Sequence, residues 1–570
     1  MSEAEAATLT AEPEAQVEEA VAEPMSDEEI LAMLTPEFAE ACQSSPQLLR
    51  YVRTLPLRES GPPLYMPILT RKAGEQKAKN LIYPVSDEVY IHVLTAHGEE
   101  RDLYIPIEPN YQMDVSEKFA LVESLLLDHV ADFAELQGKE ERAEKIKETL
   151  EVICKGGGSG KHKKGGKGLN LTDEEYLALR HLVIREKVGL GVLEPMVLDK
   201  NIEDISGSGI GYVFLEHKVF KSMKSLIGFE THEELDLFVL RLSEQIKRPV
   251  TMRNPIVDAV LPDGSRINIV YGREVSQRGS NFTIRKFSDT PISILELIEF
   301  GSISYQMAAY LWMILEEGMN GFVSGETASG KTTLINAILT FIAPAAKIVT
   351  IEDTPEVQVP HHNWLREVAK NPRPGEKSAA VTMMDLLKAA LRQRPNLIII
   401  GEIRGEEGAV AFQAMQTGHA VMATFHASSV EKLIQRLTGH PINIPKTYVD
   451  NLNVVILQSA VKLPTGKMGR RAIGISEIVG YDPTTNSFSY IEVFRWDPVK
   501  DKFEFVGDKN SYLLEQKIAP RYGIPPKRKW EIYNHMEKRA RILEKIHKNK
   551  ITGYHELYRV LAQAQRDGLV

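Results

Sequence analysis

A glycine-rich segment in the second half of this 570-residue chain has residue types and spacing that suit phosphate binding. It has the pattern G-x-x-x-x-G-K-T and comprises Gly325, Glu326, Thr327, Ala328, Ser329, Gly330, Lys331, Thr332 and Thr333. Its glycines let successive backbone N–H groups point inward and form a nest for an anion. Lys331 can reach the β- and γ-phosphates of a nucleotide, and the hydroxyl of Thr332 can ligate Mg²⁺. The segment therefore predicts that the protein binds a nucleoside triphosphate.

The residues on either side of this segment are those that such a loop requires. The apolar run 321–324 can form a short buried strand, and the run 334–339 can form a helix. A helix that begins directly after the loop adds the positive end of its dipole to the same position. A chance match in a glycine-rich turn is the alternative, and the two correct flanks count against it.

Two other apolar runs end in carboxylates that could act beside a bound phosphate. The run 347–351 is followed by Glu352 and Asp353, and the run 397–400 is followed after one glycine by Glu402. Strands of an α/β sheet deliver their C-terminal residues to the crevice where the ligand binds. Glu352 could orient or deprotonate an attacking water, and Glu402 could hold Mg²⁺ or its water shell. A pair of acids in a solvated turn is the alternative for the first site.

Histidines and arginines near these runs are weaker candidates. His419 and His426 bracket the apolar run 420–425, seven positions apart, so they need not face one site. Zinc is not expected, because no cysteine or third histidine is nearby. Hydrogen bonding to the γ-phosphate or its water is the better functional hypothesis, against a structural role at the strand ends. Arg392 and Arg394 could sense phosphate, or could stabilise the end of the helix before the strand.

The composition is that of a globular protein with about three or four domains. The net charge of −10 argues mildly against a protein that coats nucleic acid. The two cysteines, Cys42 and Cys154, share no motif spacing, which excludes a disulfide framework and a four-cysteine zinc site. No signal peptide and no transmembrane helix are expected, since no window approaches 18 apolar residues. We expect a cytoplasmic protein that reaches the membrane only through partners.

The order of the expected elements divides the chain into seven stretches. Ser26 with Glu29, and Thr172 with Glu175, have the spacing of capping boxes at helix starts. The Gly/Lys-rich joint is interpreted as a flexible linker, with a patch for anionic lipid or nucleic acid as the alternative. The stretches are a disordered acidic tail (1–25), an N-terminal α+β docking domain (26–154), the flexible Gly/Lys linker (155–170), a second α+β domain (171–288), a hinge (289–300), an α/β nucleotide-binding core (301–505) and a helical C-terminal region (506–570).

Taken together, the motifs resemble those of the secretion ATPase superfamily, which powers type II secretion, type IV pili and type IV secretion. Its Walker A, Asp box, Walker B and His box correspond to GETASGKTT, TIEDTPE, RQRPNLIIIGEIRGEE and GHAVMATFHASS. The resemblance spans about 170 to 480 and includes LEP at 193–195, LPDGSR at 261–266 and FTIRK at 282–286. Three features are similar to the archaeal branch, above all to the archaellum motor ATPase and its pilus and secretion relatives. They are the sequence RGEEGAVAFQAMQTGHA, the segment 441–445 and the charged helical tail. Two cysteines cannot build the zinc insertion of bacterial type II enzymes.

The resemblance implies a fold class: an α/β RecA-like P-loop NTPase domain preceded by an α+β (PAS-like) nucleotide-clamping domain, with an N-terminal α+β region and a helical C-terminal tail. It implies that Lys331 and Thr332 bind phosphate and Mg²⁺, that Glu352 activates water and that Glu402 is the Walker B acid and a metal ligand. His419 and His426 would line the γ-phosphate side. Arginines of the preceding domain would reach over the nucleotide, with Arg266 and Arg285 as the best matches and Arg253, Arg273 and Arg278 as weaker ones.

The function implied by the resemblance is a Mg-ATP-hydrolysing motor that forms a homo-oligomeric ring, expected to be a hexamer. It would act at the cytoplasmic face of the membrane on a polytopic platform protein, and so assemble a filament of pilin-like subunits or drive secretion. The alternatives are a type IV secretion or DNA-transfer ATPase on the same fold, and a RecA-like nucleic-acid motor, for which DNA should stimulate turnover. A nucleotide-gated scaffold with little turnover is disfavoured, because such a site needs neither Glu352 nor Glu402.

Overall fold

The computed structural model describes residues 25–568 apart from 97, 130–132, 134–135, 137, 156–168, 170, 262, 288–289 and 371–379. The chain divides into two compact units, Met1–Lys286 and Phe287–Val570. The predicted acidic tail, apart from Met25, and most of the predicted linker lie outside the described residues. Within the described part, no helix combines the length and the apolar character that crossing a membrane requires.

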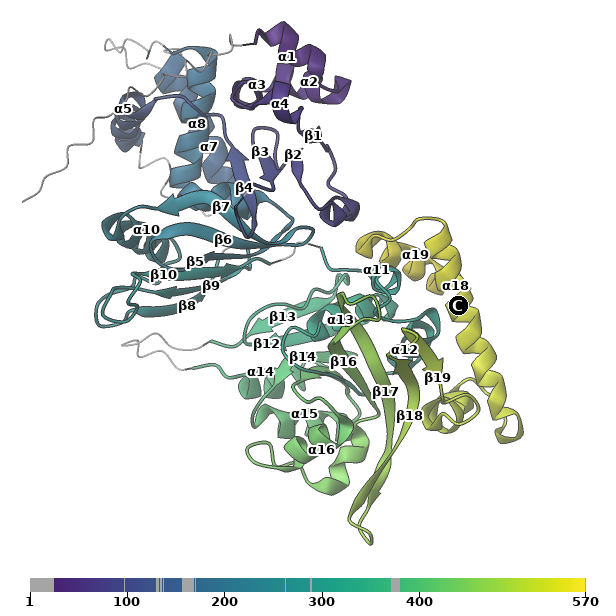
Figure 1. The fold of residues 1–570 in the computed structure, drawn as a ribbon. Helices are drawn as coiled ribbons and strands as arrows, with labels where there is room; N and C mark the ends of the chain where they lie inside the picture. Colours follow the sequence, from purple (N-terminus) through teal and green to yellow (C-terminus); the bar gives the residue numbers. More distant parts are fainter. Residues whose placement is uncertain are drawn as a thin grey trace, which may run out of the picture. The chain divides into compact units, whose positions relative to one another are not determined.

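The first unit is built on one mixed sheet, which has ten strands in its described residues (Figure 1). The spatial order of the strands is β1-β2-β3-β4-β7-β6-β5-β10-β9-β8. The pairs β1–β2 and β4–β7 are parallel, and the other pairs are antiparallel. The strands are β1 (Leu64–Tyr65), β2 (Asn80–Pro84), β3 (Tyr90–Leu94), β4 (Asp102–Ile107), β5 (Ile202–Gly207), β6 (Gly211–His217), β7 (Lys221–Phe229), β8 (Ile256–Val260), β9 (Arg266–Val270) and β10 (Asn281–Arg285).

The helices of the first unit begin at side chains that the sequence marks as caps. Ser26 and Thr172 each accept a hydrogen bond from a backbone N–H three residues on, and the glutamates at those positions bond back, which confirms both capping boxes. The helices are α1 (Asp27–Met33), α2 (Pro36–Ser44), α3 (Pro46–Arg53), α4 (Leu57–Ser60), α5 (Ser116–Leu126), α7 (Lys139–Lys155), α8 (Asp173–Lys187), α9 (Glu194–Leu198) and α10 (His232–Gln245).

The parallel pair β4–β7 joins the two regions that were predicted as separate α+β domains. Asp102 lies opposite Met223, and Tyr104 lies opposite Ser225. Buried side chains from both regions, among them Leu81 and Leu215, belong to one hydrophobic core. The hydroxyls of Tyr83 and Tyr104 both donate to the buried carboxylate of Asp199, at 2.6 and 3.2 Å. The stretches 26–154 and 171–288 therefore share one sheet and one core, and the PAS-like identity of the second stays a prediction.

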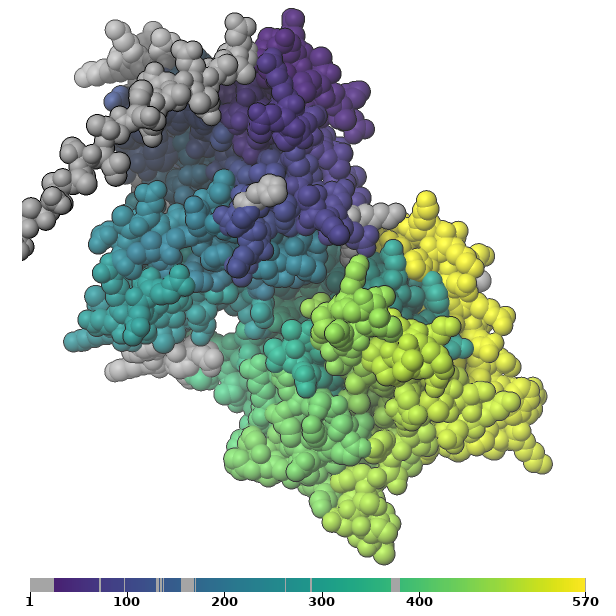
Figure 2. Space-filling view, in the orientation of Figure 1, coloured from purple at the N-terminus to yellow at the C-terminus, as the bar shows by residue number. Residues whose placement is uncertain are grey.

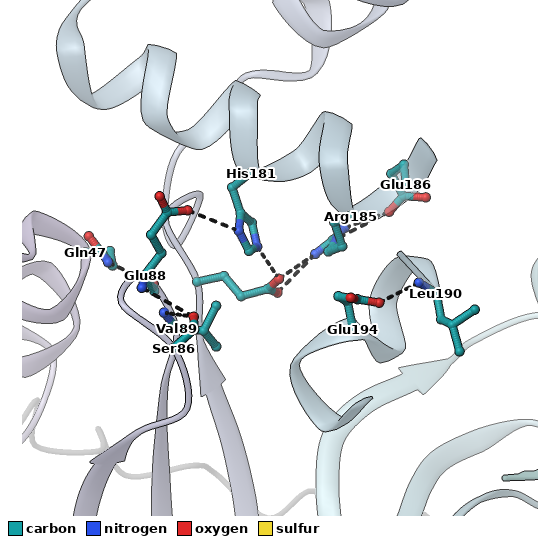
Figure 3. Close-up of polar contacts among 10 residues, drawn as sticks. Gln47, Ser86, Glu88, Val89, His181, Arg185, Glu186, Leu190 and Glu194 are labelled. Atoms are coloured by element: carbon teal, nitrogen blue, oxygen red, sulfur yellow. Dashed lines mark hydrogen bonds and ion pairs between the residues drawn. The ribbon is translucent and has the colours of Figure 1, made fainter. Parts of the chain in front are cut away.

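A cluster of charged side chains ties α8 to the loops of the N-terminal strands (Figure 3). His181 Nε2 lies 2.8 Å from Glu108 Oε1, and its Nδ1 lies 3.8 Å from Glu88. Arg185 donates to both oxygens of Glu108, at 3.1 and 3.0 Å. Burial lowers the pKa of His181, but the hydrogen bonds to Glu108 and Glu88 outweigh burial, so that this pKa is raised above its ordinary value. The pKa values of both glutamates are held below theirs.

The second unit is built on a nine-stranded sheet in the order β13-β12-β14-β15-β11-β16-β17-β18-β19, counted over its described residues (Figure 1). The pairs from β13 to β16 are parallel, and those from β16 to β19 are antiparallel. The strands are β11 (Gly321–Ser324), β12 (Ile348–Glu352), β13 (Trp364–Val368), β14 (Leu397–Ile403), β15 (Ala420–Phe425), β16 (Val454–Lys462), β17 (Met468–Asp482), β18 (Ser487–Asp497) and β19 (Lys502–Phe505).

The inner parallel strands β11, β12, β14 and β15 are largely apolar on both faces because helices cover both faces of the sheet (Figure 1). Along β14, Leu397 and Ile399 belong to the core on the side of α12, α13 and α18, whereas Ile398 and Ile400 belong to the core on the side of α14, α15 and α16. The helices are α11 (Ile294–Glu299), α12 (Tyr305–Glu316), α13 (Lys331–Ile338), α14 (Met383–Ala390), α15 (Glu407–Gln416), α16 (Val430–Thr438), α17 (Ala519–Arg521), α18 (Ile532–Lys548) and α19 (Tyr554–Arg566).

The end of the core departs from the α/β alternation that we expected as far as residue 505. Beyond β16 the chain forms three antiparallel strands in succession, with no helix between them in the described residues. The C-terminal helices then follow, and in Figure 2 they form one exposed side of this unit (yellow). The apolar face of α18, with Met536 and Leu543, packs into the same core as α12. The stretch predicted as a hinge, 289–300, contains α11, which begins at a capping box of Ser293 and Glu296.

The charged cluster of the first unit predicts a pH dependence of local stability. Because His181 has a raised pKa in the folded state, its contribution is complete below its unfolded value of about 6.5 and is lost as pH rises through the folded value. Glu108 and Glu88 have lowered pKa values, so their contribution is lost as pH falls below about 4.5. Protection of α8 amides against hydrogen exchange, corrected for intrinsic rates, should therefore decline from pH 6 to pH 8.5.

The matched variants for this prediction are His181→Gln and His362→Gln. The first should lower the free energy of opening at pH 6 by about 1.5–3 kcal/mol, the usual value of a hydrogen bond to a charged group, and should remove the decline above pH 6. The second removes an exposed histidine of the other unit and should leave α8 unchanged. Equal protection in all three proteins across this range would contradict the assignment.

Candidate functional site

The glycine-rich segment forms the turn between β11 and α13, as the sequence predicts. Gly330 has a φ of 94° and begins α13, whose first residue is Lys331. Gly325 lies so close to the neighbouring strand β16 that a Cβ there would come within 2.0 Å of the backbone oxygen of Gln458. Both glycines are therefore required by the backbone, Gly330 by its left-handed conformation and Gly325 by the close approach.

The side chain of Lys331 folds back onto this loop. Its Nζ donates to the backbone oxygens of Gly325 at 3.1 Å and of Glu326 at 2.9 Å, and lies 3.5 Å from Nδ1 of His426. Burial lowers the pKa of this amine. A phosphate in the loop can thus be bound by exchanging hydrogen bonds to carbonyl oxygens for stronger ones to an anion.

Four parallel strands bring the other predicted residues to the same edge of the sheet. Ser324 at the end of β11 lies opposite Phe425 at the end of β15. Ile351 of β12 lies opposite Ile400 of β14, one residue before Glu352 and two before Glu402 respectively. The loop after β11 and the last residues of β12, β14 and β15 therefore meet where a sheet of this kind binds its ligand.

Glu352 is the most unusual of these side chains, because it is buried to 1% exposure with one oxygen unused. Its Oε1 accepts hydrogen bonds from the backbone N–H groups of Glu356 and Val357, both at 2.8 Å. Its Oε2 has no hydrogen-bond partner among the described residues. Burial raises the pKa of this carboxyl to about 7, although the two backbone bonds oppose the shift. Such a group can take up a proton near neutral pH.

Glu402 lies between the imidazole of His426 and the guanidinium of Arg404. Its Oε1 is 2.7 Å from Nε2 of His426, and its Oε2 pairs with the guanidinium of Arg404, whose pKa this hydrogen bond raises. Burial is the main cause of a lowered pKa of His426. Arg436 of α16 donates to the backbone oxygen of His426. The structure thus brings Glu402 and His426 into contact with each other and His426 close to Lys331.

Glu356 is a residue of this site that our sequence analysis did not select. Its Oε2 accepts a hydrogen bond from the hydroxyl of Thr332 at 3.0 Å, and its backbone oxygen accepts one from Asn336 at 3.2 Å. The position was visible in the sequence as the last residue of the Asp box, four residues after Glu352. Its contact with Thr332 joins two separate motifs, which no local pattern shows.

The oxygen atoms gathered here suit Mg²⁺, which prefers carboxylate, hydroxyl and phosphate oxygens. Thr332, Glu356 and Glu402 supply such atoms at one edge of the sheet. The described residues hold no set of three or more His, Cys, Asp or Glu side chains arranged to bind a metal ion by themselves. Mg²⁺ at this position would therefore need further oxygens from nucleotide phosphates and water.

Within one chain the structure does not bring His419 to this cluster, and its place on the γ-phosphate side with His426 stays a prediction. It precedes β15 and contacts Thr417 at 3.2 Å, whereas His426 follows the strand. Seven residues of extended chain separate the two by about 23 Å. Because the loop lies at the C-terminal ends of the strands, His419 is at the opposite edge of the sheet within one chain.

The predicted arginines lie elsewhere in the chain. Arg266 and Arg285 face each other across β9 and β10 of the first unit, and Arg285 donates to Asp204 at 3.0 Å. The weaker candidates Arg253, Arg273 and Arg278 belong to loops of that unit. A role of any of these arginines at the nucleotide stays a prediction. Arg392 and Arg394 follow the end of α14.

Comparisons with known proteins agree with the motifs. Residues 186–477 match the family described as "Type II/IV secretion system protein". An uncharacterised protein of Methanocaldococcus jannaschii, MJ0900, is 42% identical over 552 residues, which is 95% of this chain and 98% of the relative. Type IV secretion system protein PtlH of Bordetella pertussis is 30% identical over 271 residues, covering 44% of this chain and 79% of PtlH.

Among solved structures, the VirB11 ATPase of the Brucella suis type IV secretion system is similar over 52% of this chain and 93% of its own. Its identity is 24% and its TM-score is 0.26. The family match covers more than half of the chain, and the M. jannaschii relative matches it nearly end to end and agrees with the archaeal branch. The chain therefore belongs to the type II/IV secretion system ATPase family.

Proposed function

We propose that this protein hydrolyses Mg-ATP as a subunit of a ring-shaped motor. The observation that supports this most directly is that one edge of a parallel sheet gathers an anion-binding loop and a buried carboxylic acid with one free oxygen. The side chains that we assign to the site are Lys331, Thr332, Glu352, Glu356, Glu402 and His426.

Phosphate binding is the first step that these residues perform. Backbone N–H groups of the loop and the start of α13 face the anion, and Lys331 leaves the oxygens of Gly325 and Glu326 for the β- and γ-phosphates. Thr332 and Glu402 would hold Mg²⁺, and Glu356 would have to release the Thr332 hydroxyl for that. Mg²⁺, when bound, neutralises charge on the phosphate oxygens.

Water activation follows from the state of Glu352. A carboxyl with a pKa of about 7 is deprotonated in a large fraction of molecules at neutral pH and can accept a proton from water. Its Oε1 is held by two backbone N–H groups, so its Oε2 is the oxygen free for that proton. His426, which lies 2.7 Å from Glu402, would hydrogen-bond the γ-phosphate or its water.

The larger function follows from family membership rather than from the site. We propose that the ring is a hexamer that acts at the cytoplasmic membrane on a polytopic platform protein, and that it drives assembly of an archaeal pilin-like filament, an archaellum or a pilus, or type II-like secretion. Arg266 and Arg285 would supply positive charge to the nucleotide during the cycle. Similarity to PtlH over 44% of the chain supports type IV secretion as the alternative.

Nucleotide binding should depend on the loop in a residue-specific way. Lys331→Ala removes the phosphate-binding amine, and Gly325→Ala forces the loop away from the oxygen of Gln458, which would lie 2.0 Å from the new Cβ. Both variants should bind fluorescent mant-ADP at least about tenfold more weakly, the scale of one charge-assisted hydrogen bond. Gly480→Ala, where nothing lies within 4 Å of the added Cβ, should bind as the wild type does. Full affinity in Lys331→Ala would refute the site.

Hydrolysis should depend on Glu352 and on its ionisation. Because a general base acts when deprotonated, kcat should rise from pH 6 to pH 8 and level off above the pKa of about 7. Glu352→Gln should keep nucleotide affinity, lower kcat by about 100- to 10,000-fold and lose the pH dependence. Glu504→Gln, which changes an exposed glutamate of β19, should retain both. Wild-type turnover in Glu352→Gln would show that another group acts as the general base.

A further inference from the structure

Arg470 contacts the phosphate-binding loop from a neighbouring hairpin. It lies on β17 opposite Ala460 of β16, and its Nε donates to the backbone oxygen of Ala328 at 3.0 Å. Its Cδ lies 3.2 Å from where a Cβ on Gly330 would be placed. The residue lies outside every motif that the sequence analysis selected, 137 positions after the Thr333 that ends the loop segment (470 − 333).

Arg470 contacts the loop at Ala328, a residue in an unfavourable backbone conformation. Ala328 has a φ of 60°, in the left-handed region that residues with a Cβ rarely adopt, and such a conformation persists only when its surroundings hold it. Because the peptide group is planar and trans, fixing the direction of the Ala328 carbonyl also fixes the N–H of Ser329, which points the opposite way. That N–H is directed to the oxygen of Glu326 at 3.4 Å, inside the loop.

Arg470 differs from Lys331 in what it can do during the cycle. Lys331 also holds loop carbonyls, those of Gly325 and Glu326, but it must release them to bind phosphate. Arg470 binds the carbonyl oxygen of the peptide between Ala328 and Ser329, on the opposite edge from the N–H of Ser329. It therefore need not move when an anion enters the loop. It is therefore the side chain that can hold this peptide in both the empty and the occupied loop.

Arg470 also differs from the adjacent arginine in its charge environment. Arg471 is buried, and its guanidinium forms a two-point ion pair with Asp501 at 2.8 and 2.7 Å. Arg470 is exposed, and no carboxylate of the described residues forms an ion pair with it. An uncompensated positive charge beside the loop favours a bound polyphosphate through the Coulomb interaction.

We propose that Arg470 is a positioning residue for nucleotide phosphates, which holds the Ala328 peptide so that the loop keeps its anion-binding shape and which adds one uncompensated charge to that site. The inference rests on the proposed function, in that the loop must bind a nucleoside polyphosphate. It assigns to the β16–β17 hairpin a direct part in nucleotide affinity.

The test compares Arg470→Ala, Arg470→Lys and Lys462→Ala with the wild type. Lys462 is exposed on the same hairpin, so its removal takes away the same charge without touching the loop. We measure the Kd of mant-ADP, its displacement by inorganic pyrophosphate, and KM and kcat for ATP. Arg470→Ala should weaken mant-ADP and pyrophosphate alike by about tenfold, the scale of a charge-assisted hydrogen bond, with KM rising more than kcat falls. Arg470→Lys should restore part of the loss.

The melting temperature and Lys331→Ala separate the possible failures. Arg470 is exposed, so Arg470→Ala should melt as the wild type does, and Lys462→Ala should bind normally. Any of three results for Arg470→Ala would overturn the inference. These are a wild-type affinity for mant-ADP, a loss of affinity equal to that of Lys462→Ala, and a weaker affinity for mant-ADP with an unchanged affinity for pyrophosphate. If Lys331→Ala binds normally as well, the proposed function fails; if it loses binding while Arg470→Ala does not, only this inference fails.

Discussion

Parallel pairing of β11, β12, β14 and β15 is the constraint on which the rest of the site depends. Each of these strands is apolar on both faces and is buried between two layers of helices. Their registers leave no freedom to slide, because a shift of one residue would turn every side chain to the other face. The loop, Glu352, Glu402 and His426 are consequently fixed at one edge by a core that lies away from them.

The polar groups of this edge largely satisfy one another in the chain as it stands. Lys331 bonds to loop oxygens, Thr332 to Glu356, and Glu402 to His426 and Arg404. Buried polar groups without partners are costly, so ligand binding here is an exchange of partners rather than a gain of new ones. Glu352 Oε2 and the hydroxyl of Ser329 are exceptions, since neither has a hydrogen-bond partner among the described residues. The burial of Glu352 is also the main cause of the raised pKa of its carboxyl.

The site residues that directly follow a strand in the sequence were predictable. Those that reach the site only through tertiary contacts were not. The loop, Glu352 and Glu402 each follow an apolar run, so a local pattern places them. His419 also adjoins such a run, but periodicity does not tell which end of a strand faces the ligand, and His419 precedes β15, whereas the loop lies at the C-terminal ends of the strands. Glu356 and Arg470 reach the loop through tertiary contacts that no short-range pattern encodes. The β4–β7 pair escaped prediction for the same reason, since it joins strands more than 100 residues apart.

ATP turnover as a function of protein concentration, for the wild type and Glu402→Gln, with and without DNA, tests the central claim most directly. A ring motor whose sites are completed on assembly predicts a specific activity that rises with concentration, ignores DNA and collapses in the variant. A specific activity that is flat with concentration and stimulated by DNA would contradict the account. It would point instead to a nucleic-acid motor on the same fold.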